Sequence, residues 1–233
     1  NGQEELFAVL SGEMPCAPNE LYFKDDDLSG IGITDRRGMG VLGAPEERLG
    51  HAAAPDMSLT ENAMLTGVAR KELARGGMLN WRKARQFAEE IIAKFDVRTP
   101  GPTNAARSLS GGNLQKFVIG REVLQKPELL VVNQPTWGVD AAAAAAIRQA
   151  LMDLAAAGTA VVVISQDLDE LMEISDRFAE RRAPQRATQH PGLGRRTDRV
   201  VDGRRTWAGH ARPPDRTAGS SRRFTGRPYG RAD

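Results

Sequence analysis

In the first hundred positions, apolar residues recur at helical spacing in some stretches and form one short continuous run in another. Leu6, Val9 and Leu10 fall on one face and indicate a short helix that ends near Gly12. The segment 38–50 contains a brief apolar run, which predicts a buried strand leading into a proline-containing loop. Further on, apolar residues recur at helical spacing opposite charged ones and predict an amphipathic helix: Trp81, Ala84, Ala88, Ile91, Ile92 and Phe95.

Two other segments add to this pattern. Residues 20–33 alternate weakly and are predicted as strand and turn. Ser58 and Glu61 have the spacing of a capping box, in which the serine side chain accepts from the N–H of Glu61 and the carboxylate reaches back. A helix is therefore expected to begin at this point. Together with the amphipathic helix, residues 57–104 are interpreted as a small helical insert between two α/β stretches.

From residue 109 onward, predicted strands and helices alternate. The order is a glycine-led helix, a buried strand, an alanine-rich helix closed by Gly158, a second buried strand and a short helix, over residues 110–125, 128–132, 140–157, 160–165 and 167–175. Continuous apolar strands separated by helices are typical of a parallel sheet covered on both faces. The predicted fold class is therefore α/β.

Composition places the chain among globular proteins and divides it in two. Of 233 residues, 40% are hydrophobic and 27% are charged, and no apolar run approaches the roughly 20 residues of a membrane helix. The single cysteine, Cys16, excludes an internal disulfide. Residues 181–233 contain 14 Arg and 4 Asp, a charge of +10, so the formal total of +2 leaves −8 for residues 1–180. An acidic body is thus followed by a basic stretch of different character.

The stretch SLSGGNLQK, residues 108–116, carries the most specific chemistry. Ser110 is predicted at the N-cap of a helix, and Gly111 and Gly112 lack side chains where the first free N–H groups point. A helix N-terminus with bare amides and one hydroxyl can hold phosphate oxygens. The alternative is a plain Ser-Gly-Gly turn before a helix. The buried strand that follows, ending in Asn-Gln-Pro-Thr at residues 133–136, favours the phosphate site.

Several ordered motifs together resemble the ATPases of ABC transporters over about residues 1–180. The stretch 109–116 resembles the signature motif, and Asn133-Gln134-Pro135-Thr136 stands where that family has the end of Walker B, usually Asp-Glu-Pro-Thr. Gly138-Val139-Asp140 resembles the D-loop, 164–170 resembles the switch segment with Gln166 in place of the usual His, and Pro45-Glu46-Glu47-Arg48 falls where the Q-loop would be. The combination is similar to the second nucleotide-binding half of importers for simple sugars and nucleosides.

The resemblance implies a P-loop NTPase-like parallel sheet with a helical insert and an N-terminally truncated chain. Gly2 stands at the last glycine of the P-loop, with Gln3 in place of its Lys and Glu4 in place of its Ser or Thr. The Walker B Asp is replaced by Asn133, and the catalytic Glu by Gln134, which cannot accept a proton from water near neutral pH. Gln166 cannot titrate there either. Intrinsic hydrolysis by this chain alone is therefore expected to be negligible.

The resemblance also implies a division of labour between two halves. The nucleotide-binding residues implied are Gly2, Gln3, Glu4, Leu109, Ser110, Gly111, Gly112, Asn113, Asn133 and Asp140. The intact signature motif would complete a site whose other groups lie on a first ATPase half, with ATP and Mg²⁺ bound mainly there. This chain's own site either holds a nucleotide loosely or only packs; both alternatives stay open. Glu46, Glu47 and Arg48 are expected to contact membrane permease subunits.

The arginine-rich stretch 181–233 is expected to be disordered, because it has almost no aliphatic residues with which to bury a core. A frameshifted origin is favoured over a basic arm for nucleic acid or anionic lipid, in which Trp207, Phe224 and Tyr229 would stack on bases. His190 and His210 lack metal-ligand spacing, so no metal site of the protein's own is expected.

The function expected from these features is an ATP-binding subunit of an importer for a nucleoside or simple sugar. It would lie peripherally at the cytoplasmic face of the inner membrane and meet a substrate-binding protein only indirectly. The alternatives are the ATPase of another ABC importer class and, from the tail only, a basic nucleic-acid-binding protein.

Overall fold

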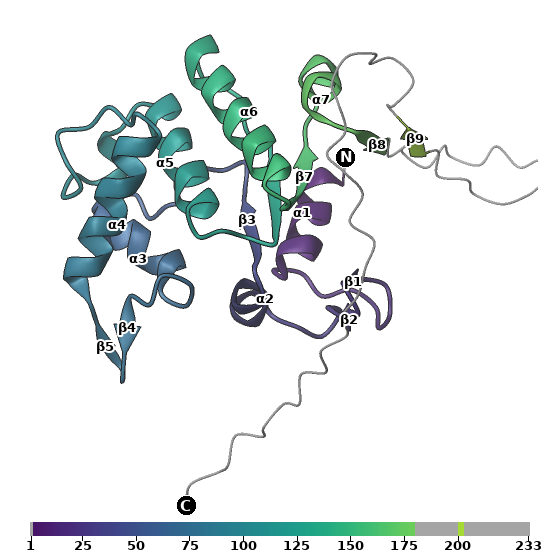
Figure 1. The fold of residues 1–233 in the computed structure, drawn as a ribbon, viewed down its shortest axis with the longest axis horizontal. Helices are drawn as coiled ribbons and strands as arrows, with labels where there is room; N and C mark the ends of the chain where they lie inside the picture. The colour runs from purple at the N-terminus through teal and green to yellow at the C-terminus, as the bar shows by residue number, and fades with distance from the viewer. Residues whose placement is uncertain (1, 180–199, 203–233) are drawn as a thin grey trace, which may run out of the picture.

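The computed structural model describes residues 2–179 and 200–202. Its centre is a parallel sheet in the order β3-β6-β7, formed by Val41–Ala44, Leu129–Asn133 and Ala160–Ile164 (Figure 1). Val41 pairs with Leu129, and Leu129 pairs with Ala160, so all three strands end at the same edge. The α/β class with a parallel sheet, predicted from the continuous apolar runs, is confirmed.

The two faces of the sheet pack against different helices. Leu130 and Val132 point into the larger core, whereas Val131 points to the other face and packs with Phe7 of α1 (Gln3–Ser11). Figure 1 shows α1 on one side of the sheet and helices α5 (Gly111–Val123) and α6 (Ala141–Ala156) on the other. This alternation is the period of two that a strand buried on both faces requires.

The segment 57–104 contains α3 (Leu59–Gly67), a hairpin of β4 (Ala74–Arg75) and β5 (Met78–Leu79), and α4 (Trp81–Lys94). The predicted capping box is confirmed: the Glu61 N–H donates to Ser58 Oγ over 3.2 Å, and the Ser58 N–H donates to Glu61 Oε2 over 2.7 Å. Trp81 is 50% exposed, so its predicted place on the apolar face is wrong. It lies at the first position of α4, directly after the N-cap Asn80, beyond the buried stripe.

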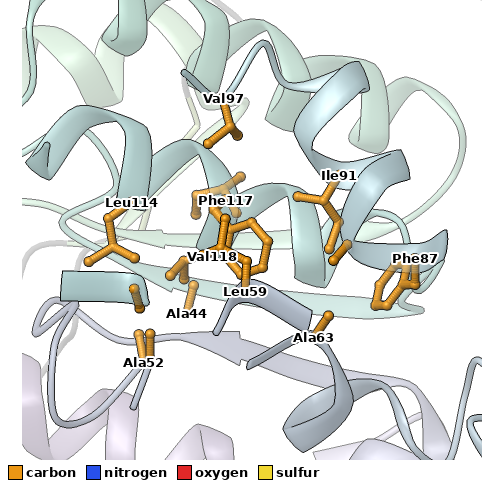
Figure 2. Packing of buried hydrophobic residues seen from close by; sticks show 14 of the residues in the cluster. Ala44, Ala52, Leu59, Ala63, Phe87, Ile91, Val97, Leu114, Phe117 and Val118 are labelled. Carbon is orange, nitrogen blue, oxygen red and sulfur yellow. The ribbon is translucent and has the colours of Figure 1, made fainter. Parts of the chain in front are cut away.

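Helix α5 joins this segment to the sheet through a shared core. Phe117 and Val118 of α5 lie beside Leu59 and Ile91 from α3 and α4 in Figure 2, and all four side chains are fully buried. The amphipathic helix predicted over residues 81–95 is thereby confirmed, and its partner is the glycine-led helix. The N-terminus of α5 is held at a fixed place relative to the sheet.

Arginine side chains fasten several of these elements. Arg36 of α2 (Ile33–Met39) is 1% exposed and donates to the carbonyl oxygens of Val9, Leu10, Leu28 and Ile31. Burial lowers the pKa of the Arg36 guanidinium. Because the Val9 and Leu10 carbonyls lie at the C-terminus of α1, this contact complements the negative end of that helix.

The remaining elements are short. Residues 20–33 contain the predicted strand and turn as the hairpin β1 (Tyr22–Phe23) and β2 (Asp26–Asp27), and α7 spans Leu168–Ile174. A 3₁₀ turn, Ala106–Ser108, precedes α5. None of the helices in the described part of the chain is long and apolar enough to cross a membrane.

The prediction of disorder for residues 181–233 falls almost wholly outside the described residues. The exception is β9 (Val200–Asp202), which pairs antiparallel with β8 (Arg177–Ala179). The predicted stacking residues Trp207, Phe224 and Tyr229, and also His190 and His210, lie outside the described part.

Candidate functional site

The N-terminus of α5 is open to solvent and carries a hydroxyl beside bare amides. Ser110 is its N-cap, as predicted, and its Oγ accepts from the Asn113 side-chain amide over 2.9 Å and from the Asn113 N–H over 3.4 Å. Ser110 and Gly111 are exposed, and Gly112 is half-buried. Leu109 packs against the core below them. The positive end of the helix and its free N–H groups thus face solvent, where an anion can reach them.

Asp140 lies next to this helix end and begins another helix. Its Oδ1 accepts from the Ala143 N–H over 2.8 Å as the N-cap of α6, and this bond lowers the pKa of the carboxyl. A Cβ added at Gly112 would lie 3.4 Å from Asp140 Oδ2. The N-termini of α5 and α6 therefore lie close together at this point.

The loop after β3 sends one side chain to the same place. Arg48 donates through Nε to Gln115 Oε1 over 3.0 Å and through Nη2 to the Trp137 carbonyl oxygen. Burial lowers the pKa of its guanidinium, and nearby Glu46 opposes this effect. Glu46 is half-buried and Glu47 is exposed. Of the three residues predicted to contact permease subunits, Arg48 is engaged with its own chain.

The end of β6 presents amides where the family has carboxylates. Asn133 is 3% exposed, and its Oδ1 has no hydrogen-bond partner among the described residues. Gln134 is 5% exposed and has a left-handed backbone with φ of 51°, an uncommon conformation for a residue with a side chain. Its Oε1 accepts from the Gln166 N–H over 3.5 Å. The structure therefore brings Gln134 and Gln166 together.

The start of α1 meets the same edge of the sheet. Gln3 Nε2 donates to the Ser165 carbonyl oxygen over 3.2 Å. Gly2 precedes the helix with φ of 79°, a conformation that favours glycine, and Glu4 lies in the first turn. Glu4 thus offers negative charge to the positive end of α1. The residues predicted at the P-loop, Walker B and switch positions converge here.

A carboxylate that sequence reasoning did not single out as functional joins this group. Glu170 is 4% exposed and accepts from the hydroxyls of Thr136, over 2.7 Å, and Ser165, over 2.8 Å. It lines a cavity of about 350 Å³ together with Gln134, Thr136, Trp137, Gly138, Ser165, Gln166 and Asp167. The only signal in the sequence was its place in the segment 164–170, three residues after the helix-capping Asp167.

The arrangement separates two kinds of chemistry. The α5 end offers donors and a positive helix terminus, which suit an anion. The β6 end offers amides, of which Asn133 Oδ1 is buried and free to accept, as from a water bound to Mg²⁺. The described residues contain no cluster of three His, Cys, Asp or Glu side chains able to hold a metal ion by themselves. The donors at the α5 end are of the kind that suit phosphate oxygens, but Asn133 and Gln134 cannot supply a general base.

Curated proteins with similar sequences share one role. The glucose import ATP-binding protein TsgD13 of Haloferax volcanii is 40% identical over 180 residues, which cover 76% of this chain and 33% of that protein. The nucleoside import ATP-binding protein NupA of Lactococcus lactis is 35% identical over 179 residues, and the guanosine import ATP-binding protein NupO of Bacillus subtilis is 33% identical over 179. The chain spans about a third of the length of these relatives. No family model matches.

Solved structures with the same fold are ATP-binding cassettes. A dimeric cassette in a post-hydrolysis state, bound to ADP and Pi, has a TM-score of 0.61 at 19% identity and covers 76% of this chain and 74% of its own. A second dimeric bacterial ABC transporter cassette has a TM-score of 0.60 at 18% identity, with the same coverage. At these identities the likeness establishes the fold of the chain.

Proposed function

The chain has the fold of an ABC ATPase cassette, and its homologues are ATP-binding proteins of sugar and nucleoside importers; from this premise we propose that it forms the second, charge-depleted cassette of such a protein. In this role it helps to couple ATP binding and hydrolysis to the uptake of a nucleoside or simple sugar. Membrane permease subunits and a first ATPase half are its partners, at the cytoplasmic face of the membrane.

The observation that carries this proposal is the contrast between the two ends of the site. At the N-terminus of α5, Ser110 and Gly111 are exposed, and Gly112 is half-buried. At the end of β6, Asn133 and Gln134 keep the shape of carboxylates without their charge. A cassette that acts mainly by completing another cassette's site needs an accessible α5 N-terminus. It does not need carboxylates at the end of β6.

The chain's own groups then have defined roles in phosphoryl transfer. The Ser110 hydroxyl and the free N–H groups of Gly111 and Gly112 donate to phosphate oxygens of a nucleotide held by the first half. Asn133 Oδ1 can accept from a water on Mg²⁺, the ion that neutralises phosphate charge when bound. Gln134 orients a water at most, because an amide does not take up its proton near pH 7. Hydrolysis is assigned to the site that the first half supplies with carboxylates.

Two readings remain as competitors. An ATPase of another ABC importer class would use the same cassette, and only the cargo would differ. Nucleic-acid binding rests on residues 181–233, which lie almost wholly outside the described part. The names of the curated relatives favour sugars and nucleosides as the cargo.

ATP turnover tests the proposal. The chain alone should hydrolyse no ATP above a blank, because Asn133 and Gln134 carry no charge. In a full-length protein with a first cassette, Ser110→Ala should lower kcat about 10- to 100-fold, since a charge-assisted hydrogen bond contributes roughly 1.5–3 kcal/mol.

Ser108→Ala is the matched control for that measurement. Ser108 is also exposed and lies two residues away, but its hydroxyl donates to the Ala105 carbonyl oxygen of the preceding turn. It should leave kcat unchanged. Turnover by the chain alone, lost on Ser110→Ala, would contradict the proposed division between two cassettes.

A further inference from the structure

Arg48 connects its own loop to two other segments that carry different motifs. Its Nε donates to Gln115 Oε1 of α5 over 3.0 Å, and its Nη2 donates to the Trp137 carbonyl oxygen in the turn after β6. Gln115 is 1% exposed, and its Nε2 donates in turn to the Pro135 carbonyl oxygen over 2.9 Å. One guanidinium and one buried amide therefore connect the loop after β3, the signature helix and residues 135–138.

Two glycines leave room for this guanidinium. A Cβ added at Gly111 would lie 2.9 Å from Arg48 Nη1, closer than real Cβ contacts allow. A Cβ added at Gly138 would lie 3.5 Å from Arg48 Nη2. Gly111 is the first residue of α5, so the guanidinium lies directly against the start of that helix. The guanidinium therefore lies between the start of α5 and Gly138.

The acceptors of Arg48 are neutral oxygen atoms. None of the ion pairs found among the described residues involves Arg48, although Glu46 is near enough to act on its pKa. A planar guanidinium presents its donors in a rigid fork, whereas a lysine ammonium has three rotatable donors on a flexible stem. Geometry, more than charge neutralisation, is what this side chain provides here.

We propose that Arg48 is a positioning residue that holds the N-terminus of α5 and the turn 135–138 in one fixed arrangement. The N-terminus of α5 is the segment that the proposed function assigns to the partner cassette's nucleotide, so the consequence for turnover rests on that function. The positioning of these two segments by Arg48 does not depend on the proposed function. Without Arg48, the start of α5 and the turn around Trp137 would lose the link through the guanidinium, and the bond from Gln115 to the Pro135 carbonyl oxygen would remain.

Hydrogen exchange of the full chain, without nucleotide, tests the ordering. The Trp137 N–H donates to the Gln134 carbonyl oxygen over 3.2 Å, and the Val139 N–H donates to the Thr136 carbonyl oxygen over 3.4 Å, so both amides report on the turn. Arg48→Met should speed their exchange at least tenfold. Arg48→Lys should not restore slow exchange, because one ammonium does not reproduce the planar fork.

Arg70→Met is the matched control. Arg70 likewise donates to carbonyl oxygens in another turn, those of Gln125 and Lys126, over 3.2 and 2.8 Å. Its loss should leave exchange at Trp137 and Val139 within twofold of the unchanged protein. If Arg48→Met also leaves exchange at the Trp137 and Val139 amides within twofold of the unchanged protein, the proposal is wrong.

Gly111→Ala tests whether the helix end and the turn are linked through Arg48. Alanine favours the helix more than glycine does, so any loosening of the turn must come from displacing the guanidinium. The substitution should speed exchange at Trp137 about as Arg48→Met does, and add nothing when Arg48 is already Met. Fully additive effects in the double variant would overturn the link.

Turnover in the full-length protein separates the ordering from the proposed function. Arg48→Met should lower kcat at least fivefold and leave KM for ATP within twofold, because the first cassette binds most of the nucleotide; Arg70→Met should change neither. If kcat falls with Ser110→Ala but not with Arg48→Met, the positioning role is wrong. If neither Ser110→Ala nor Arg48→Met lowers kcat, while Arg48→Met still speeds amide exchange at Trp137 and Val139, the proposed function is wrong and the positioning role of Arg48 stands.

Discussion

At the scale of single residues, amide side chains bond to the chain where the family resemblance implies charged groups. Gln3 donates to the Ser165 carbonyl oxygen, and Gln134 accepts from the Gln166 N–H. Only Asn133 keeps a buried oxygen without a partner among the described residues. An amide both donates and accepts, so these bonds form without a metal ion or phosphate to balance charge. Gln3 and Gln134 thus find their partners within the chain itself.

The contrast between the two ends of the site predicts an order of severity for two substitutions. In the full-length protein, Gly111→Asp should abolish ATP turnover and transport. The introduced carboxylate would face Arg48 Nη1 and place negative charge where phosphate oxygens are expected. Gln134→Ala should leave most of both activities, because Gln134 does not act as a base. Turnover and uptake assays check this, and the reverse order would mean that this cassette houses the working site.

At the scale of elements, α5 is tied to its neighbours by a buried ionic group. Glu122 is fully buried and accepts from Arg37 over 2.6 Å and from Arg121 over 2.8 Å. Arg121 also donates to the carbonyl oxygens of Asn62 in α3 and Ala52. This group therefore joins α2, α3 and α5, and it holds the signature helix from the end opposite Ser110.

Removing the charge of Glu122 should destabilise the fold strongly. Glu122→Gln would leave two largely buried arginines without their carboxylate, at a cost of about 3–5 kcal/mol. Glu89→Gln is the control: Glu89 pairs with Arg85 on an exposed face of α4, and its loss should cost less than about 1 kcal/mol. Urea unfolding of both variants measures the difference. Equal costs would mean that the buried group contributes no more than an exposed pair.

The same carboxylate predicts a pH dependence. Burial acts to raise the pKa of Glu122, but the Arg121 and Arg37 guanidinium groups outweigh it and hold the pKa below its ordinary value of 4.5. A lowered carboxyl pKa contributes stability that is present above the unfolded value and lost as pH falls through the folded one. The difference in unfolding free energy between the unchanged protein and Glu122→Gln should therefore shrink as pH falls below about 4.5.

Helices and strands with a regular spacing of apolar residues could be predicted from the sequence. Contacts between side chains far apart in the sequence could not. The strands around Val131 and Val162 and helix α4 followed from local apolar spacing, and the cap at Ser58 from a three-residue motif. The contacts of Arg48 and Glu170 join residues 89 and 34 positions apart, and no local pattern encodes them. Trp81 was misplaced because helical spacing does not show where the buried stripe begins.

At the scale of the whole molecule, charge is distributed unevenly. Residues 1–180 carry −8 and residues 181–233 carry +10. The site, however, does not depend on net charge: its donors are a helix terminus, a hydroxyl and a guanidinium, all local. Because negative charge repels anions at long range, the proposed nucleotide contact relies on the local donors of the α5 end.

The order of the sheet has a consequence for how the chain behaves in solution. Among the described residues, strand β7 forms one edge of the sheet β3-β6-β7, and its residues Ala160 to Ile164 contain no charge and no proline. Ala160 is exposed, and Val161, Val162 and Val163 are only partly buried. An uncharged edge strand of branched residues is a template for cross-β association with another copy. Aggregation during refolding should therefore begin at β7.

A charge at the open position of this strand should suppress that association. Ala160→Lys places an ammonium at the exposed start of β7, the device by which natural edge strands resist pairing. Light scattering during refolding should fall, while the circular dichroism of the folded chain stays the same. Lys at the exposed helical position Ala142 is the control and should leave scattering as it was. If both variants scatter light equally, aggregation begins at a site other than β7. If only Ala160→Lys scatters less, shielding β7 alone should be enough to keep the chain from aggregating at high concentration.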